Sequence, residues 1–268
     1  MTTLALSSPR RRLLEDDPRF AGGALVLTLL CAPLLLGLMI DTRDYLGENV
    51  WIKPLKFSVS LAVFLATLAW AARYIPARLR ESRFFAAYQW IVLFCIAGEM
   101  LWIGGAAAFA TGSHFNVSTP LMGTLYGLMG IFAVILTSAA ATYGALIGRH
   151  SSAPEAPAIG LSFIATVIAT LIVAGTMAEG LSHHVGVESA GADRQWLMGW
   201  SREVGDLRVP HFFATHIMQA VPLAWFAVAA VMVPPKGTGL VLTLLALAVT
   251  MATFAQALAG APFLPGLL

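Results

Sequence analysis

Histidines are the side chains in this sequence best suited to chemistry, because imidazole titrates near neutral pH and binds transition metals. The chain has six, and five of them fall on the expected outer side of the apolar segments described below, at their outer ends or in outer loops: His114, His183, His184, His211 and His216. In helical bundles, histidines from different helices hold haem iron or an ion such as zinc, copper or iron. We therefore expect a metal or haem site with His183 and His216 as ligands and the other three as alternates.

Three ionisable side chains lie inside otherwise apolar segments, where each costs about 2.5–3.5 kcal/mol on insertion scales. They are Glu99, Glu179 and Lys56. Glu179 shares a helical face with His183, because the two are one helical turn apart. Their cost makes the three residues functional candidates, so we expect catalytic roles in acid–base chemistry or in charge compensation.

Four further residues are candidates for contacting a substrate or forming a lid. Trp102 follows Glu99 by one helical turn, and Gln219 shares a wedge of its segment with His216. Asp206 and Arg208 lie near the end of a polar stretch over 182–210, which is long enough to fold over a site. A lid and an ordinary solvated loop both fit this stretch.

The composition limits which elements can position these residues. The chain has 268 residues, of which 58% are hydrophobic and 11% are charged, whereas a soluble domain has about 25% charged residues. Between positions 84 and 148 the one formally charged residue is Glu99, and none occurs from 237 to 268. This excludes a soluble enzyme, a nucleic-acid binder, a secreted disulfide scaffold and a disordered chain.

Seven apolar segments are each long enough to cross a bilayer, at about 20 residues per crossing. They cover approximately 21–40, 55–74, 84–110, 120–148, 157–181, 211–233 and 237–262. Continuous apolar runs favour helices over the alternating strands of a barrel. We predict an all-α integral membrane protein in which a segment over 1–20 precedes one seven-helix domain over 21–268.

The distribution of Lys and Arg predicts the orientation, because cytoplasmic loops carry the excess of positive charge. With the N-terminus in the cytoplasm, inner segments hold ten of these residues and outer loops five: Arg10, Arg11, Arg12, Arg19, Arg73, Arg78, Arg80, Arg83, Arg149 and Lys236 against Arg43, Lys53, Arg194, Arg202 and Arg208. We expect a multi-pass protein of the cytoplasmic (inner) membrane with its C-terminus outside. The stretch over 182–210 is then an outer loop.

Small residues four apart let a second helix approach closely. The pairs Gly123/Gly127 and Gly144/Gly148 form such faces in the fourth segment. Packing within the bundle and a homo-oligomer interface both fit this pattern. The other expected partners are the lipid bilayer and a small molecule or ion from the outer side, with no nucleic acid.

These features lead to one preferred function and two alternatives. The first is an outward-facing His/Glu/Lys pocket that binds a metal or haem for redox or membrane-embedded enzymatic chemistry. The second uses the same groups in a proton-coupled small-solute transporter or channel, since buried acids and histidines form proton relays. The third is a non-catalytic membrane subunit. No sequence motif dictates a particular cofactor.

Overall fold

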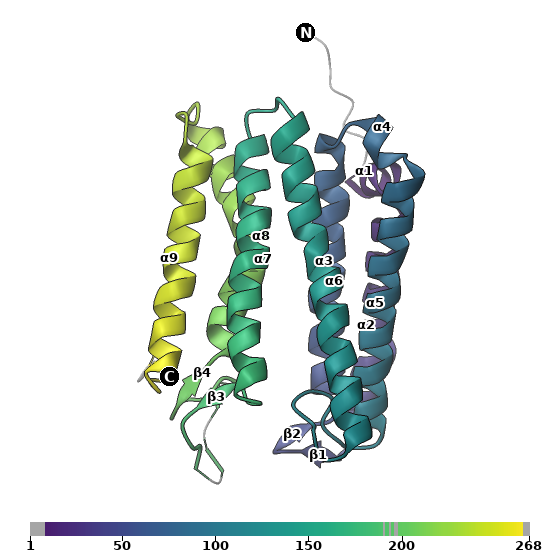
Figure 1. The fold of residues 1–268 in the computed structure, drawn as a ribbon, viewed down its shortest axis with the longest axis vertical. Helices are drawn as coiled ribbons and strands as arrows, with labels where there is room; N and C mark the ends of the chain where they lie inside the picture. Colours follow the sequence, from purple (N-terminus) through teal and green to yellow (C-terminus); the bar gives the residue numbers. More distant parts are fainter. Residues whose placement is uncertain (1–8, 190, 193, 196–197, 265–268) are drawn as a thin grey trace. The chain divides into compact units, whose positions relative to one another are not determined.

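The computed structural model describes residues 9–189, 191–192, 194–195 and 198–264 (Figure 1). The described chain is predominantly helical, with four very short strands. Seven of the helices found in these ranges are long and apolar enough to cross a membrane. This confirms the prediction of an all-α fold and supports a multi-pass membrane protein.

The seven long helices follow the apolar segments expected from the sequence. They are α2 (Pro18–Ile40), α3 (Ile52–Ala71), α5 (Arg83–Ala108), α6 (Pro120–His150), α7 (Ala156–Glu179), α8 (Arg208–Val231) and α9 (Thr238–Leu258). The short helical elements are α1 (Pro9–Asp16), η1 (Ala72–Tyr74) and α4 (Ala77–Arg80). The strands are β1 (Asp44–Tyr45), β2 (Glu48–Asn49), β3 (His184–Val185) and β4 (Gly205–Asp206).

Local side-chain chemistry sets where two of these helices begin. The carboxylate of Asp17 accepts a hydrogen bond from the backbone N–H of Phe20, and Pro18 occupies the first turn of α2. Ser82 caps α5 in the same way, through the backbone N–H of Phe85. Such caps satisfy backbone donors that have no partner within the helix.

The chain divides into two compact units, Met1–Ala139 and Ala140–Leu268, hereafter unit 1 and unit 2. In unit 1, α2 packs along α3, and α3 packs along α5. Phe20, Leu65, Val92 and Ile103 are buried on these helices. The antiparallel β1–β2 hairpin joins α2 to α3 and carries Glu48.

In unit 2, α7, α8 and α9 pack on one another (Figure 1). Alanines on α7 and α8 face Ile217, Val221 and Trp225 in a compact apolar core. Strands β3 and β4 pair antiparallel and place His184 opposite Asp206. The backbone at Gly205 packs against Ala257 of α9 and leaves no room for a β-carbon, so this short sheet is fixed to the end of α9.

The two glycine pairs of α6 differ in what surrounds them. A β-carbon on Gly144 would lie 2.7 Å from the carbonyl oxygen of Gly160 in α7, and one on Gly160 would lie 3.3 Å from the Cα atom of Gly148. Gly144 and Gly148 therefore serve packing within unit 2. A β-carbon on Gly127 would meet no atom within 4 Å.

Candidate functional site

Glu99 is the most unusual side chain of unit 1. It lies on the buried face of α5 and is 2% exposed. Neither of its carboxylate oxygens has a hydrogen-bond partner among the described residues. A buried polar group without a hydrogen bond costs several kcal/mol, and an unpaired charge costs more. Such an arrangement needs a functional explanation.

His114 is the ionisable side chain that contacts Glu99. Its Nε2 atom lies 4.0 Å from Oε2 of Glu99, and its Nδ1 atom lies 3.0 Å from Oγ of Ser113. Both come from the 109–119 loop between α5 and α6. Trp102, one turn after Glu99, donates from its indole N–H to the carbonyl oxygen of Ser113 at 2.6 Å. The loop is therefore attached to the same helix that carries the acid.

Aromatic rings surround the imidazole of His114. The centroid of the Phe57 ring lies 5.7 Å from that of His114, and the Tyr126 ring lies 6.3 Å from it. Lys53, in the first turn of α3, is close enough for its positive charge to act on both Glu99 and His114. The site thus combines a carboxyl, an imidazole and an ammonium group within a largely apolar surround.

The surroundings of His114 favour its neutral form. Burial, followed by the positive charge of Lys53, lowers the pKa of His114 to about 3. The neutral imidazole is therefore the form favoured at pH 7. Protonation of this imidazole would place a second positive charge beside Lys53.

A second buried polar group lies toward the other end of α5. Gln89 donates from Nε2 to Oδ2 of Asp17 at 2.6 Å, and Arg19 donates to Oε1 of Gln89 at 3.3 Å. Gln89 and Glu99 are both on the buried face of α5, about 15 Å apart along the axis at 1.5 Å per residue. Val92, among the residues between them, is buried.

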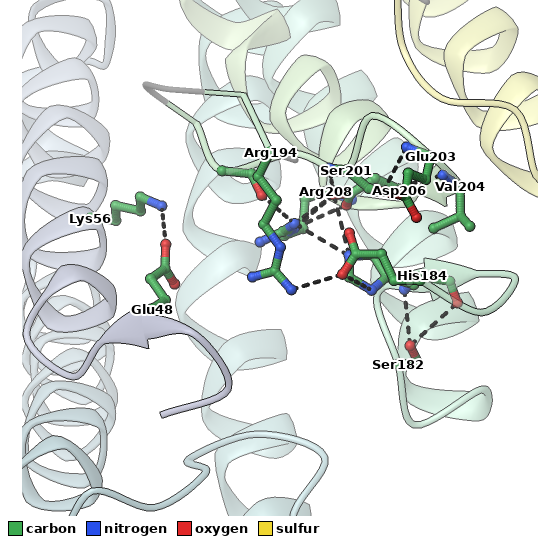
Figure 2. A network of polar contacts seen from close by, with 12 residues as sticks. Glu48, Lys56, Ser182, His184, Arg194, Ser201, Glu203, Val204, Asp206 and Arg208 are labelled. Carbon is green, nitrogen blue, oxygen red and sulfur yellow. Dashed lines mark hydrogen bonds and ion pairs between the residues drawn. The ribbon is translucent and has the colours of Figure 1, made fainter. Parts of the chain in front are cut away.

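Lys56 is partly exposed and is not buried as its position inside an apolar segment suggests. Its ammonium group pairs with Glu48 of β2 at 2.9 Å (Figure 2), and its side chain is 40% exposed. The counter-charge that acts on Glu99 belongs instead to Lys53, one turn earlier in α3.

In unit 2, Asp206 is the centre of a dense network (Figure 2). Its side chain is fully buried and accepts hydrogen bonds from the guanidinium of Arg208 at 2.6 Å and from the backbone N–H of Ser201 at 3.0 Å. Nε2 of His184 lies 3.7 Å from Asp206, and Nδ1 lies 3.6 Å from Glu188. Arg194 pairs with Glu188 at 2.8 Å.

This network favours the ionised form of both carboxylates. Burial alone would raise the pKa of Asp206, but the contacts with His184 and Arg208 outweigh it and hold that pKa well below its usual value. For Glu188, burial likewise raises the pKa, but the hydrogen bonds from Arg194 and Ser201 and the charges of His184 and Arg194 together outweigh burial and lower that pKa. Two guanidinium groups thus occupy the carboxylates. The arrangement joins several described residues of the polar stretch over 182–210, for which a lid and an ordinary solvated loop both remain predictions.

Among the other predicted histidine ligands of unit 2, His183 lies next to His184 in the chain, and His211 and His216 both lie on α8. The rings of His183 and His184 have centroids 4.1 Å apart. His216 lies with Nδ1 2.7 Å from the carbonyl oxygen of Phe212, which requires the proton on Nδ1 and leaves Nε2 for any metal. Nδ1 of His211, in the first turn of α8, is buried without a hydrogen-bond partner among the described residues. Gln219 follows on α8, two turns after His211.

Two further observations bear on the predicted chemistry. Glu179 is the last residue of α7 and is exposed. Within the ranges that the structure describes, no group of three or more His, Cys, Asp and Glu side chains is arranged to hold a metal ion. The metal-binding role of the histidines and the catalytic role of Glu179 both stay predictions.

The structure brings together one predicted group in each unit. Glu99, Trp102 and His114 meet in unit 1, while His184, Asp206 and Arg208 meet in unit 2. Sequence reasoning missed Ser113 and Tyr126 as neighbours of His114, and it did not single out Lys53, whose charge acts on Glu99. It also missed the Asp17–Gln89 contact, which joins residues far apart in the chain.

Comparison with protein-family models, with curated proteins and with solved structures gives no match to this chain. The geometry of the two units is therefore what a functional conclusion must rest on.

Proposed function

We propose that this protein is a proton-coupled transporter of a small solute, with Glu99 as the proton-binding group. The observation that carries the proposal is the buried carboxyl of Glu99, which lacks a hydrogen-bond partner within the described residues and contacts His114. Intramembrane acid and histidine pairs are typical of proton relays in pumps and transporters.

The electrostatics of the site favour a change in its charge during function. An ionised, unpaired carboxylate is costly in an apolar surround, whereas a proton removes that cost. Lys53 acts in the opposite sense, because its positive charge compensates the ionised form. Two charge states of Glu99 can therefore be close in free energy, as reversible proton binding requires.

A polar group at the other end of α5 favours a transporter over a binding pocket that opens to only one side of the membrane. Gln89, Asp17 and Arg19 supply a polar group on the same helix face, within the same unit. Buried apolar residues, including Val92, separate the two polar groups. A carrier that exposes Glu99 to alternate sides would need to open this apolar barrier.

The orientation belongs to the same proposal. We place the His114 end of unit 1 outside and the Asp17 end in the cytoplasm, because over the whole chain the segments expected to be inner hold ten Lys and Arg residues and the outer loops five. The C-terminus then lies outside the cytoplasmic membrane. A metal or haem site in unit 2 stays a separate prediction, for which elemental analysis and an absorption spectrum of the purified protein are the direct measurements.

Proton binding at Glu99 is measurable without knowing the solute. Infrared titration of the purified protein in lipid should show the carbonyl band of a protonated carboxyl, and Glu99→Gln should remove it. Glu179→Gln is the matched control, because Glu179 is exposed at the end of α7. A titrating band that persists in Glu99→Gln would refute the assignment of the proton site.

Transport requires a second measurement in proteoliposomes that contain a pH-sensitive dye. Amino acids, amines and monocarboxylates are added in turn as probes, and proton uptake is followed. We expect at least one probe to elicit uptake that falls by about tenfold or more in Glu99→Gln, the size typical of losing a proton-transfer group. Glu179→Gln should retain it. If Glu99→Gln changes only the thermal stability, the non-catalytic subunit is the better interpretation.

A further inference from the structure

The segment over 109–119 covers the buried acid of unit 1 from the end at which α5 stops. Ser113 is 3% exposed, and the His114 beside it reaches Glu99. Farther along the segment, residues 117–119 are exposed. One short loop therefore has an inner part packed over Glu99 and an outer part in contact with the surroundings.

Identified contacts attach the inner part of this loop to its neighbours. The indole N–H of Trp102 donates to the carbonyl oxygen of Ser113, and Asn116 closes the loop on itself by donating to the carbonyl oxygen of Gly112 at 3.1 Å. Tyr45 of the β1–β2 hairpin lies against Gly112, where a β-carbon would come within 2.8 Å of its hydroxyl oxygen. The bond from Trp102 ties the loop directly to the helix that carries Glu99.

Phe115, the residue after His114, has a backbone conformation that is unfavourable for its bulky side chain. Phe115 has φ of 59°, in the left-handed region that bulky residues rarely adopt. Its ring packs edge-on against Tyr126, with centroids 5.8 Å apart. Non-glycine residues held in this region cluster at ligand clamps and switch segments, because the surrounding contacts must maintain them.

We propose that the 109–119 loop is a gate over Glu99, and that the Trp102–Ser113 hydrogen bond is its latch. The inference rests on the proposed proton-binding role of Glu99 and adds how access to that group is controlled. Opening would move Ser113, His114 and Phe115 away from α5, which relieves the backbone strain and admits water to the carboxyl. Closing returns the neutral imidazole to its place between Glu99 and the aromatic rings.

The groups that face His114 make the gate sensitive to its protonation. They are Glu99 on α5, Lys53 on α3 and the hydroxyl-bearing Tyr126 on α6, with Ser113 from the loop itself. A positively charged imidazole would be buried beside Lys53 and would be expelled. Acid outside therefore favours the open loop.

A native thiol can report the opening. Cys95 lies one turn below Glu99 on α5 and is buried, whereas Cys31 on α2 is partly exposed. In the full-length protein with Cys31→Ser, a charged, membrane-impermeant methanethiosulfonate reagent should label Cys95 only when water reaches the site. Mass spectrometry of the labelled protein then gives the rate.

Trp102→Phe removes the latch donor and keeps an aromatic ring. Because losing one hydrogen bond shifts an equilibrium by about fivefold, we expect Cys95 labelling to accelerate by that factor. Trp90→Phe is the control, since Trp90 is on the same helix and 61% exposed. Hydrogen exchange should rise in 109–119 and stay slow in α5, which shows that the variant is folded.

Unchanged labelling in a folded Trp102→Phe protein would overturn the gate, and so would equal acceleration by Trp90→Phe. If Trp102→Phe raises exchange throughout α5, Arg43→Gln is the substitute, because Arg43 donates to the carbonyl oxygen of Ala108 at 2.9 Å at the base of the loop. Unchanged labelling there also overturns the gate. Labelling does not depend on proton flux, so failure of the gate leaves the result of the Glu99→Gln experiment intact.

Discussion

Two carboxylates buried to the same degree have opposite surroundings. Asp206 of unit 2 is 1% exposed, and Glu99 of unit 1 is 2% exposed. Asp206 accepts hydrogen bonds from Arg208 and from the backbone of Ser201. Glu99 accepts none from the residues that the structure describes.

Under the proposed function, this difference separates a structural acid, Asp206, from a proton-binding one, Glu99. A buried charge with a guanidinium partner and backbone donors is compensated, so Asp206 is held in its ionised state. A buried acid without donors is not held in one charge state by hydrogen bonds. A proton or a movement of the loop can therefore change its charge state. Equal burial therefore indicates nothing about role until the partners are known.

The largest effect that we expect in this comparison is on stability. Asp206→Asn would leave Arg208 partly buried without its carboxylate and should lower the free energy of unfolding by about 3–5 kcal/mol. Glu99→Gln, which removes an unpaired acid, should leave that free energy unchanged or raise it. Unfolding by denaturing detergent in mixed micelles measures both. Glu203→Gln is the control for Asp206, because Glu203 is exposed in the same loop.

A loss of similar size in Glu99→Gln would break the comparison, since it would mean that Glu99 is also structural. A loss below about 1 kcal/mol in Asp206→Asn would also contradict the comparison, since it would mean that Asp206 contributes little to stability.

The two loops should also respond to acid in different pH ranges. The pKa of His114 is lowered from 6.5 to about 3, so its contribution to stability is complete above pH 6.5 and is lost as the pH falls. At pH 5 the loss is roughly 2 kcal/mol, at 1.36 kcal/mol per pH unit. The pKa of Asp206 is lowered from 3.8, so its contribution is lost only as the pH falls below that value.

Hydrogen exchange of the two loops, corrected for the intrinsic effect of pH, measures this difference. Exchange in 109–119 should rise between pH 7 and pH 5, while exchange in the 182–207 loop should not. His114→Gln should abolish the response of 109–119. If both loops loosen at the same pH, then the titration of His114 does not control its loop.

The helix that carries Glu99 could be predicted from hydropathy, because α5 is a continuous apolar run, whereas Asp206 lies on the short strand β4 within a polar stretch. The meeting of Glu99, Trp102 and His114 also has a basis in the sequence. One-turn spacing aligns the first two, and the loop that follows α5 must return over its end. The Asp17–Gln89 contact could not be predicted, because hydropathy does not specify how α2 and α5 are rotated about their axes.

The partner of Lys56 illustrates what the sequence conceals. Glu48 reaches it because β1 and β2 form a hairpin with a two-residue turn at Leu46 and Gly47, both with positive φ. Such turns are usually Asn-Gly or Asp-Gly, so Leu-Gly gives a weak signal. The sequence alone does not indicate this pairing, and the position of Lys56 inside an apolar segment favours a buried role.

The smallest effect that we expect is therefore at Lys56. Its pair with Glu48 is partly exposed on both sides, and such pairs contribute about 0.2–1 kcal/mol. Lys56→Gln should lower the free energy of unfolding by no more than this and leave the infrared band of Glu99 at the same pH. Lys53→Gln, one turn away, should move that band to higher pH, because it removes a positive charge that favours the ionised carboxylate. If Lys56→Gln moves the band and Lys53→Gln does not, the counter-charge of the site is the lysine that the sequence first indicated.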